Sequence, residues 1–360
     1  MKNNNLNAIG VMSGTSLDGI DVSYISTDGK SSFHHKYSSI YKFRKSTREL
    51  INNLINDFSK NKKAIGRFIQ CEKAVTEDYI DAIQKFIKLY NIKKIDLIAL
   101  HGQTVFHSSS LKSSIQLCNG KFIAEKIKKI VVSDFRQKDL FNNGEGAPLV
   151  PIFHRLLINK FKLHKPCSFI NIGGISNITF IDQRNKFIAY DMGPGMCLLD
   201  KYVFKKKKKL YDHYGKYSLK GNVNKKALKA LRSDKFFKKS FPKSLDKNYF
   251  SFAPVSRLNF YDACATLATF TAYCIIDNVK KFKCKKIIIS GGGAKNKFIM
   301  NLIKLNFKEK VISINLLHSD AKFIESQAFA YLGVRRLKNL SISFPGTTGV
   351  KRPITGGKID

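Results

Sequence analysis

Short apolar segments alternate with stretches of helical periodicity in the first third of the chain. Residues 8–12 and 20–26 have the length and apolar content of strands, and a glycine-rich segment separates them. A helix is expected next, because Ser46 and Glu49 fit a capping box before apolar residues that recur on one face. A second helix is expected over about residues 76–89. This region therefore has the pattern of an α/β domain.

A strand of the buried type follows at residues 95–100 and leads into the polar segment 101–104. Residues 147–151 contain two prolines and are expected to cross between two lobes.

The second half of the chain begins with the same strand–turn–strand pattern. Residues 168–172 and 178–181 are predicted strands around a Gly-Gly turn, and another strand is expected to end near Tyr190. Residues 286–290 form a further strand, which three glycines connect to a helix over 296–305. Two such hairpins, one opening each half, indicate an internal duplication.

The halves are expected to form two lobes of one hinged body, because no long linker or low-complexity tract separates them. Lobe I is predicted to comprise residues 1–150 and to be completed by the C-terminal segment 340–360. Lobe II is predicted to comprise residues 151–339. A chain of 360 residues is long enough to bury a sizeable core in this arrangement.

The strong positive charge, formally +38, raises nucleic acid as a partner. Only 11 of the 64 basic residues are arginine, whereas phosphate and base recognition favours the arginine fork. The lysines are also spread over the whole chain, and the densest run, residues 205–209, is typical of a solvated surface. No nucleic-acid partner is therefore expected, although a basic DNA-binding ATPase stays open as an alternative that rests on charge alone.

No membrane partner is expected either, because the longest apolar runs have the length of strands. The polar residues 1–7 lack the apolar core of a signal peptide, which predicts a cytoplasmic protein. The seven cysteines are odd in number and show no CxxC spacing, as expected for reduced thiols.

Three glycine-rich turns carry the candidate chemistry, because glycine lets backbone N–H groups converge on phosphate oxygens. The spacing of Gly14 and Gly19 is that of a P-loop, but Ile20 stands where a P-loop has lysine and a strand follows. The turn that begins at Gly291 has Asn296 where the dinucleotide fingerprint requires glycine. Both common motifs are excluded. Two phosphate-type hairpins and a late triple-glycine turn together predict a kinase whose nucleotide lies between two lobes.

Several longer segments resemble the anhydro-N-acetylmuramic acid kinases, in the order and at the spacing of that family. They are residues 12–21, 101–104, 134–136 with Asp139, 146–151, 171–177, Asp191 with 193–195, 291–294 with Asn296, Glu325 with 328–330, and 348–349. The resemblance implies a two-lobed actin/hexokinase-like (ribonuclease H-like) α/β fold with its active site in the cleft between the lobes. It also implies a homodimer.

The implied reaction uses ATP and Mg²⁺. Such enzymes cleave the internal bridge of 1,6-anhydro-N-acetylmuramic acid with water and phosphorylate the freed O6, giving N-acetylmuramic acid 6-phosphate in peptidoglycan recycling. By resemblance, Asp191 is the catalytic base that activates the water. An aspartate that caps the helix near Gly195 is the structural alternative for this position.

The resemblance also assigns binding residues. Residues expected to bind the nucleotide are Gly14, Thr15, Ser16, Leu17, Asp18, Gly19, Ile20, Asp21, Gly173, Gly174, Gly291, Gly292, Gly293 and Asn296. Asp18 and Asp21 are the expected metal ligands. Residues expected to bind the sugar are His101, Gln103, Thr104, Arg136, Asp139, Gly193 and Glu325.

Three departures from the family pattern bear on catalysis. Met192 and Met196 replace smaller or polar residues on either side of the Gly-Pro-Gly turn, and the segment 242–247 keeps Lys-Ser but lacks an arginine. Two alternatives stay open. One is another sugar kinase of the superfamily, in which Asp191 deprotonates a sugar hydroxyl, and the other is a relative that binds nucleotide or sugar without turnover.

Overall fold

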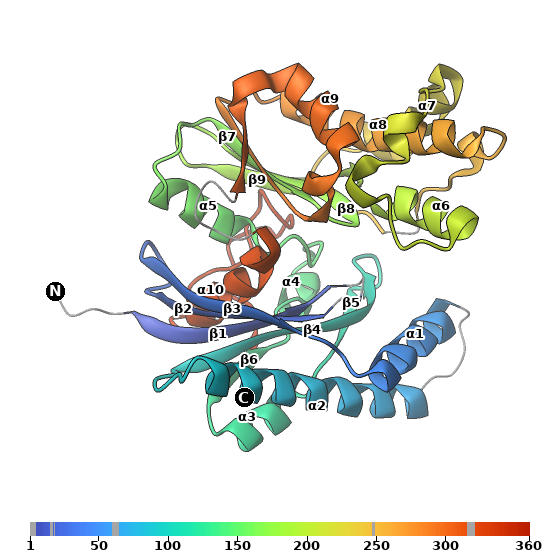
Figure 1. Cartoon of the computed structure of the whole chain (residues 1–360). Helices are drawn as coiled ribbons and strands as arrows, with labels where there is room; N and C mark the ends of the chain where they lie inside the picture. The colour runs from blue at the N-terminus through green and yellow to red at the C-terminus, as the bar shows by residue number, and fades with distance from the viewer. Residues whose placement is uncertain (1–4, 15–16, 18, 60–64, 247–248, 315–320) are drawn as a thin grey trace. The chain divides into compact units, whose positions relative to one another are not determined.

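The structure is a computed structural model, and the described residues are 5–14, 17, 19–59, 65–246, 249–314 and 321–360. The chain forms two compact units (Figure 1). The first unit comprises Met1–Lys160 and Phe323–Asp360, and the second comprises Phe161–Lys322. No helix within the described residues is long and apolar enough to span a membrane.

A mixed sheet forms the centre of the first unit. Its strand order is β12-β6-β4-β1-β2-β3, and β5 pairs with the C-terminal part of β4. β1 pairs with β2 and β2 with β3 in antiparallel fashion, whereas β4 is parallel to both β1 and β6. The strands are β1 (Leu6–Ser13), β2 (Ile20–Thr27), β3 (Phe33–Tyr41), β4 (Leu97–Ser108), β5 (Ser113–Leu117), β6 (Ile130–Ser133) and β12 (Lys358–Ile359).

Helices cover both faces of this sheet, with α2 on one side and α10 on the other (Figure 1). They are α1 (Lys45–Ser59), α2 (Ile65–Leu89), α3 (Gly120–Ile127), α4 (Gln137–Phe141), α5 (Pro151–Lys160) and α10 (Ile324–Leu337). Apolar residues of α1 and α2, such as Leu54 and Tyr79, share a core with Ile9 and Val11 of β1. On the opposite face α10 crosses β1 at Gly10, where a Cβ would collide with the backbone of Ser326 and Ala330. Glycine at this position therefore permits the close approach of the helix.

The second unit has a smaller sheet of order β11-β10-β7-β8-β9. Its strands are β7 (Cys167–Ile172), β8 (Ile175–Ile181), β9 (Phe187–Pro194), β10 (Lys286–Ser290) and β11 (Val311–Ser313). Its α-helices are α6 (Cys197–Lys207), α7 (Lys225–Arg232), α8 (Phe260–Lys280) and α9 (Lys297–Phe307). Most of α8 is buried, from Ala263 to Val279, and packs with apolar side chains of β7, β9 and β10 in one core.

The two sheets share one topology. In each, three consecutive strands form an antiparallel meander, and two later strands add in parallel beside the first strand of that meander. The orders β3-β2-β1-β4-β6 and β9-β8-β7-β10-β11 therefore correspond strand for strand. This correspondence supports the duplication and confirms the predicted α/β fold class.

The limits of the units differ from the residue ranges predicted for the lobes. The helix α5, which begins at Pro151, and the helix α10 both belong to the first unit. The helix α10 belongs to the first unit because it packs on the sheet of that unit. Gly333 faces Leu97 and Ala99 of β4, and the N-terminal half of α10 lies on β1. The chain consequently passes from the first unit to the second after Lys160 rather than at residues 147–151.

Several element boundaries also differ from the predicted ones. Ser46 lies inside α1, which begins at Lys45, so the predicted capping box is wrong. The helix α2 begins at Ile65, eleven residues before the predicted start at residue 76, and its early turns are largely exposed. β4 continues to Ser108 because β5 pairs with it, and β9 continues to Pro194 because β8 pairs with it.

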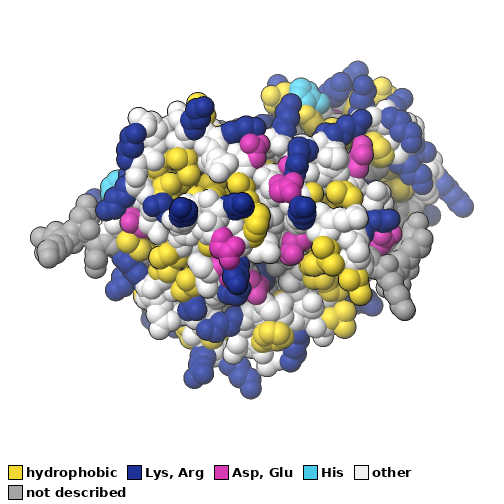
Figure 2. Space-filling model, turned by 90° about the horizontal axis from the view of Figure 1, so that it is seen from below, with side chains coloured by type: hydrophobic (Ala, Val, Ile, Leu, Met, Phe, Trp, Pro, Cys, Tyr) yellow, Lys and Arg dark blue, Asp and Glu magenta, His cyan; other side chains and the backbone are white. Residues whose placement is uncertain are grey.

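Basic side chains do not gather in one stripe on the face shown in Figure 2. Lysines and arginines are scattered there among apolar and acidic side chains. This distribution is typical of a solvated surface and agrees with the interpretation of the lysine-rich composition given above.

Candidate active site

Asp191 lies within β9 and is half-buried. Its backbone N–H donates to the carbonyl of Lys243 at 3.0 Å, and its Oδ2 accepts a hydrogen bond from the N–H of Leu245 at 2.8 Å. The helix α6 begins beyond it with Met196 at the N-cap and no side-chain capping bond. Asp191 therefore does not cap this helix, and its carboxylate is held by the segment 243–245.

Three glycine-containing turns meet at one edge of the second unit's sheet. β7 and β10 are neighbouring parallel strands, with Asn171 beside Ser290, so the turns that follow them lie side by side. The turn after β9 joins them, because the N–H groups of Gly195 and Met196 donate to the carbonyls of Gly174 and Gly173 at 2.9 and 2.8 Å. The carboxyl edge of a sheet is the usual place for a ligand in open α/β folds.

The glycines at this edge differ in what surrounds them. A Cβ on Gly292 would meet no atom within 4 Å, and one on Gly174 would meet only the Cβ of Cys197, at 3.8 Å. A Cβ on Gly293 would collide with Ile172, and Gly291 has a φ of 86° and lies against Asn171. Gly291 and Gly293 are therefore required by packing and conformation, whereas Gly174 and Gly292 leave their backbone open to a ligand. A Cβ on Gly173 would have only ordinary contacts, at 3.5 Å.

Asn296 caps a helix in this region. It is the N-cap of α9, and its Oδ1 accepts from the N–H of Ile299 at 3.2 Å. Its side chain is almost fully buried, and its Nδ2 has no hydrogen-bond partner among the described residues. A contact between Asn296 and a nucleotide stays a prediction.

The turn between β1 and β2 is described in part. Thr15, Ser16 and Asp18 lie outside the described residues. Leu17 donates from its N–H to the carbonyl of Gly14 at 3.2 Å, and the side chains of Leu17 and Ile20 are buried in the first unit's core. A ligand could meet these two residues through the backbone alone.

Asp21 is half-buried on β2, between Met12 of β1 and Ile40 of β3. Gly19 precedes the strand, and a Cβ there would collide with Ile40. No group of three or more His, Cys, Asp or Glu within the described residues could hold a metal ion. A single carboxylate such as that of Asp21 nevertheless fits Mg²⁺, which often uses one or two carboxylates and completes its shell with water and phosphate oxygens.

His101 and Arg136 form a hydrogen-bonded pair in the first unit. The guanidinium of Arg136 lies 2.8 Å from the imidazole Nε2 through Nη2 and 3.3 Å through Nε. Arginine can only donate, so Nε2 accepts and the neutral ring carries its proton on Nδ1. Burial, followed by the charge of Arg136, holds the pKa of His101 well below its ordinary value. His101 is therefore a neutral side chain at physiological pH.

A chain of hydrogen bonds fixes Arg136 from the other side. Its Nη1 donates to the carbonyl of Gly146 at 2.7 Å, and the N–H of Gly146 donates to Oδ1 of Asp139 at 2.7 Å. Oδ2 of Asp139 accepts from the hydroxyl of Thr348 at 2.5 Å. Asp139 is buried, so the structure gives it a role in placing Arg136 through Gly146. Gly146 and Thr348 received no role from the sequence, although both lie in the segments that carry the resemblance.

Glu325 lies in the first turn of α10 and is half-buried. Burial raises the pKa of its carboxyl, and the positive charge of Arg136 acts in the opposite direction. The structure thus brings three predicted sugar-binding residues, His101, Arg136 and Glu325, into one electrostatic group.

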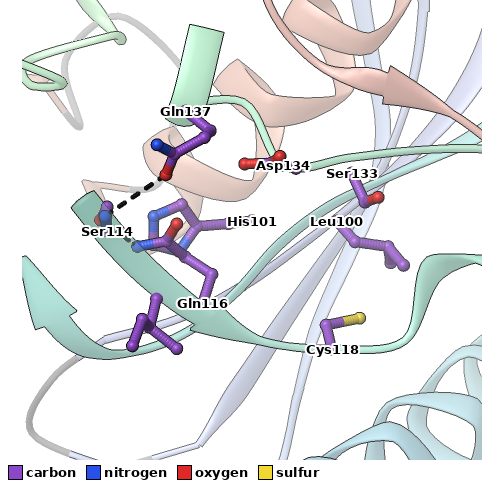
Figure 3. A pocket seen from close by; sticks show the side chains of 9 residues that line it. Leu100, His101, Ser114, Gln116, Cys118, Ser133, Asp134 and Gln137 are labelled. Carbon is purple, nitrogen blue, oxygen red and sulfur yellow. Dashed lines mark hydrogen bonds between the residues drawn. The ribbon is translucent and has the colours of Figure 1, made fainter. Parts of the chain in front are cut away.

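A small polar pocket of about 200 Å³ adjoins His101 (Figure 3). It lies where β4 changes partner, from β6 at Ala99 to β5 at Gln103. Figure 3 shows Gln137 of α4 above Ser114 of β5, whose N–H donates to Oε1 of Gln137 at 3.4 Å. The lining residues are Leu100, His101, Ser114, Ile115, Gln116, Cys118, Ser133, Asp134 and Gln137.

Gln103 and Thr104 have different surroundings. Gln103 is fully buried and pairs with Leu117, which belongs to the core under α1 and α2. Thr104 accepts a hydrogen bond from Nε2 of Gln116, a pocket residue, at 3.4 Å. Thr104 is thereby linked to the pocket. Nε2 of Gln103 donates to the carbonyl of Thr104 at 3.2 Å, and a sugar contact by Gln103 stays a prediction.

Gly193 allows a close approach in the second unit. Its φ is 154°, and a Cβ there would lie 2.6 Å from the sulfur of Cys274 on α8. Its carbonyl accepts from the hydroxyl of Ser176 at 3.0 Å. The residue therefore lets β9 pack on α8, and its predicted contact with the sugar stays a prediction.

The sequence model of the family described as anhydro-N-acetylmuramic acid kinase matches residues 6–360. A protein of that name from Pelagibacter ubique is 38% identical, with 97% of each chain covered. Another from Zymomonas mobilis is 38% identical over 98% of this chain and 99% of its own, and one from Methylorubrum populi is 34% identical over 98% of each.

The chain belongs to the anhydro-N-acetylmuramic acid kinase family. Solved structures with weaker similarity include the activator of 2-hydroxyisocaproyl-CoA dehydratase from Clostridium difficile. It is 11% identical, with a TM-score of 0.45 over 92% of this chain and 96% of its own.

The two methionines that depart from the pattern of anhydro-N-acetylmuramic acid kinases lie in the core. Met192 is fully buried in the second unit's core and follows Asp191 at a register shift of β9, between the pairs Asn177–Asp191 and Ser176–Gly193. Met196 is partly buried and packs against the same core. The hydrogen bonds of Asp191 described above involve the backbone of Lys243 and Leu245, and neither methionine side chain takes part in them.

Lys243 was missed as a candidate residue. It lies in the segment where the chain departs from the pattern of anhydro-N-acetylmuramic acid kinases, and its carbonyl accepts from the N–H of Asp191. Lysine is rarely buried, yet Lys243 is only 8% exposed. One lysine among 53 gives no signal in the sequence, so its burial could only be learned from the structure.

Proposed function

We propose that this chain hydrolyses the 1,6-anhydro bridge of 1,6-anhydro-N-acetylmuramic acid and transfers the γ-phosphoryl group of ATP to the freed O6. Membership of the family over residues 6–360 supports the substrate and the reaction. The products are N-acetylmuramic acid 6-phosphate and ADP. The proposal places the protein in peptidoglycan recycling in the cytoplasm, as a homodimer.

Asp191 is the proposed general base. Its carboxylate removes a proton from water, the water oxygen bonds to C1 of the sugar, and the bond between C1 and O6 breaks. O6 then attacks the γ-phosphorus of ATP, and the bond to the β–γ bridging oxygen breaks to release ADP. The position of Asp191 supports this role, because the segment 243–245 holds one carboxylate oxygen and a general base must be held within reach of its proton.

The glycine turns are proposed to bind the nucleotide through backbone N–H groups. Gly174 and Gly292 support this assignment, since each leaves space where a side chain would stand. Gly14, Gly19 and Asp21 would act at the first hairpin. Mg²⁺, held by Asp21 and by Asp18, would supply charge neutralisation at the phosphates.

Arg136, His101 and Glu325 are proposed to bind the sugar. The guanidinium of Arg136 is fixed by two groups of the protein and suits the lactyl carboxylate of the substrate, because arginine recognises planar anions. The neutral His101 lines the adjoining pocket. The pocket beside His101 has the polar lining that a substituent of an amino sugar requires.

The full-length family match carries this proposal, and substrate-dependent release of ADP tests it. The purified chain is incubated with ATP, Mg²⁺ and one of three sugars: the 1,6-anhydro sugar, N-acetylmuramic acid or N-acetylglucosamine. ADP release with the anhydro sugar, well above that with the other two, is expected. Preference for a sugar without the anhydro bridge would instead identify an ordinary sugar kinase.

A further inference from the structure

A row of polar residues crosses the second unit's sheet next to the glycine turns. Asp191 of β9 pairs with Asn177 of β8, and Asn177 pairs with Asn171 of β7. Asn171 in turn pairs with Ser290 of β10. The adjoining row of the register is apolar and packs in the core with α8; it consists of Tyr190, Ile178, Ile170 and Ile289. Because successive side chains of a strand point to opposite faces, the polar row lies on the other face of the sheet.

Asn177 lies beside the proposed base in this row. The pairs from Ile181–Phe187 to Asn177–Asp191 follow one another without a break. The extra residue of the register shift is Met192, which comes after Asp191. Directly paired residues on one face of an antiparallel pair of strands have Cβ atoms about 4.5–5.5 Å apart. A carboxylate and a carboxamide at this separation can contact one water molecule together.

The amides of Asn177 and Asn171 are open to a ligand. Both residues are half-buried, and neither side chain forms a hydrogen bond to any residue in the described part of the chain. Their amide atoms are also not among the buried polar atoms, so solvent reaches them. Asn171 lies against two of the glycine turns, because a Cβ on Gly291 would collide with its Oδ1 and one on Gly173 would lie 3.5 Å from its Nδ2. The polar row therefore runs from the base to the turns assigned to the nucleotide.

Hydrolysis of the anhydro bridge needs a defined orientation of the attacking water. Asp191 takes one proton of the water, and the other proton stays on the oxygen that bonds to C1. The carboxylate fixes only one of the two O–H bonds, so the water can still turn about that bond. A carboxamide next to it can accept the second O–H through its oxygen, and it stays neutral, so it does not compete for the transferred proton.

We propose that Asn177 positions the attacking water: its Oδ1 accepts one O–H of the water whose other proton passes to Asp191. This inference rests on the proposed role of Asp191 as the base. Two neighbouring side chains of one sheet then hold the water, and its free lone pair is directed at C1.

The test is the steady-state kinetics of Asn177→Ala with the anhydro sugar, ATP and Mg²⁺. The value of kcat is expected to fall by about 10²-fold, since a misplacement of reacting groups by about 1 Å costs that much. The ATP dissociation constant and the acid limb of the kcat profile should keep their wild-type values, because the side chain of asparagine does not titrate. Asn301→Ala, a change at an exposed asparagine of α9, is the control and should keep the wild-type kcat.

Asn177→Asp tests whether the two side chains are close together. It keeps the shape of the asparagine side chain and serves if the alanine variant does not fold. Two adjacent carboxylates resist ionising together, so the acid limb of the kcat profile should move up by about one pH unit or more.

A kcat of Asn177→Ala within a few-fold of wild type would contradict the inference, as would an acid limb of Asn177→Asp in its wild-type place. A loss of ATP affinity as large as the loss of kcat would assign Asn177 to the nucleotide instead. Failure of the proposed function gives a different result. If the wild-type chain releases no ADP with the anhydro sugar, or if Asp191→Asn remains active, the reaction or its base is wrong whatever the Asn177 variants do.

Discussion

Arg136 donates to Nε2 of His101 and, through the other side of its guanidinium, to the carbonyl of Gly146. One planar side chain therefore joins β4 to the loop that Asp139 holds. Burial and then the charge of Arg136 keep His101 neutral, and the hydrogen bond from Arg136 to Nε2 places the ring proton on Nδ1. Two tests of this part of the site follow from the geometry and the burial.

Replacement of Arg136 by lysine is expected to weaken sugar binding while the charge is kept. A single ammonium cannot donate to His101 and Gly146 at once with the fork geometry of arginine. Loss of one charge-assisted hydrogen bond corresponds to roughly 1.5–3 kcal/mol, or about 10- to 100-fold in KM for the sugar. The measurement is KM for the sugar and for ATP in Arg136→Lys, with Arg48→Lys, an exposed arginine of α1, as the control. Equal changes in both KM values would argue against a role on the sugar side.

The free energy of unfolding is expected to fall as pH drops below about 6.5, where histidines of the unfolded chain take up protons. Burial is the main cause of the lowered pKa of His101 and of His107. Burial also lowers the pKa of His154 to about 3. The folded protein therefore binds fewer protons than the unfolded chain in this range, and its stability decreases with acid. At pH 5.5 the loss should be about 1 kcal/mol for each histidine whose folded pKa is far below that pH.

Urea unfolding at pH 7.5 and 5.5 measures this difference. The change in midpoint between the two pH values should become smaller in His154→Phe, because that variant removes one buried base. An equal pH effect in the variant and the wild type would show that His154 does not contribute.

The element pattern in the sequence predicted the repeated architecture well, because each hairpin is local and each buried strand has an apolar run. What it missed depends on contacts between distant segments. The strand β4 extends past Leu100 because β5 pairs with it, and the helix α10 belongs to the first unit because Gly10 admits it. Neither contact leaves a periodic signal.

The site could be predicted as a set of residues but not as an arrangement. Sequence spacing does not reveal that Asp139 acts through Gly146, or that Asn296 caps α9. It also does not separate glycines that packing requires from glycines that leave open space. Met192 illustrates the same limit, since its proximity to Asp191 in sequence does not place its side chain at the carboxylate.

Gly292 and Gly293 offer a direct test of the nucleotide assignment. Gly292→Ala adds a methyl group where no atom lies within 4 Å, so the free energy of unfolding should change by less than about 0.5 kcal/mol. ATP binding should weaken, because the methyl group would occupy space assigned to the ligand. Gly293→Ala should destabilise the fold by about 1–3 kcal/mol through its collision with Ile172. Thermal unfolding and calorimetric titration with ATP measure the two effects, and unchanged ATP affinity in Gly292→Ala would contradict the assignment.

Asp191→Asn is expected to lower kcat by about 10²–10⁴-fold, because an amide cannot accept the proton of the attacking water. The amide oxygen can still accept from the N–H of Leu245, so folding and ATP affinity should remain close to wild type. Asp277→Asn, a change at an exposed carboxylate of the same unit, is the control. Steady-state kinetics and the ATP dissociation constant distinguish a catalytic role from a structural one, and a kcat within a few-fold of wild type would exclude Asp191 as the base.

The coupling of bridge hydrolysis to phosphorylation is tested most directly by the mass and the reducing end of the product. The wild-type chain is given ATP, Mg²⁺ and 1,6-anhydro-N-acetylmuramic acid, and the sugar product is isolated. The account predicts a sugar phosphate with the mass of the substrate plus one water and one phosphoryl group, with a free reducing end, formed in equal amount to ADP. A phosphorylated sugar that keeps its anhydro bridge, or ADP formed without any sugar phosphate, would contradict it.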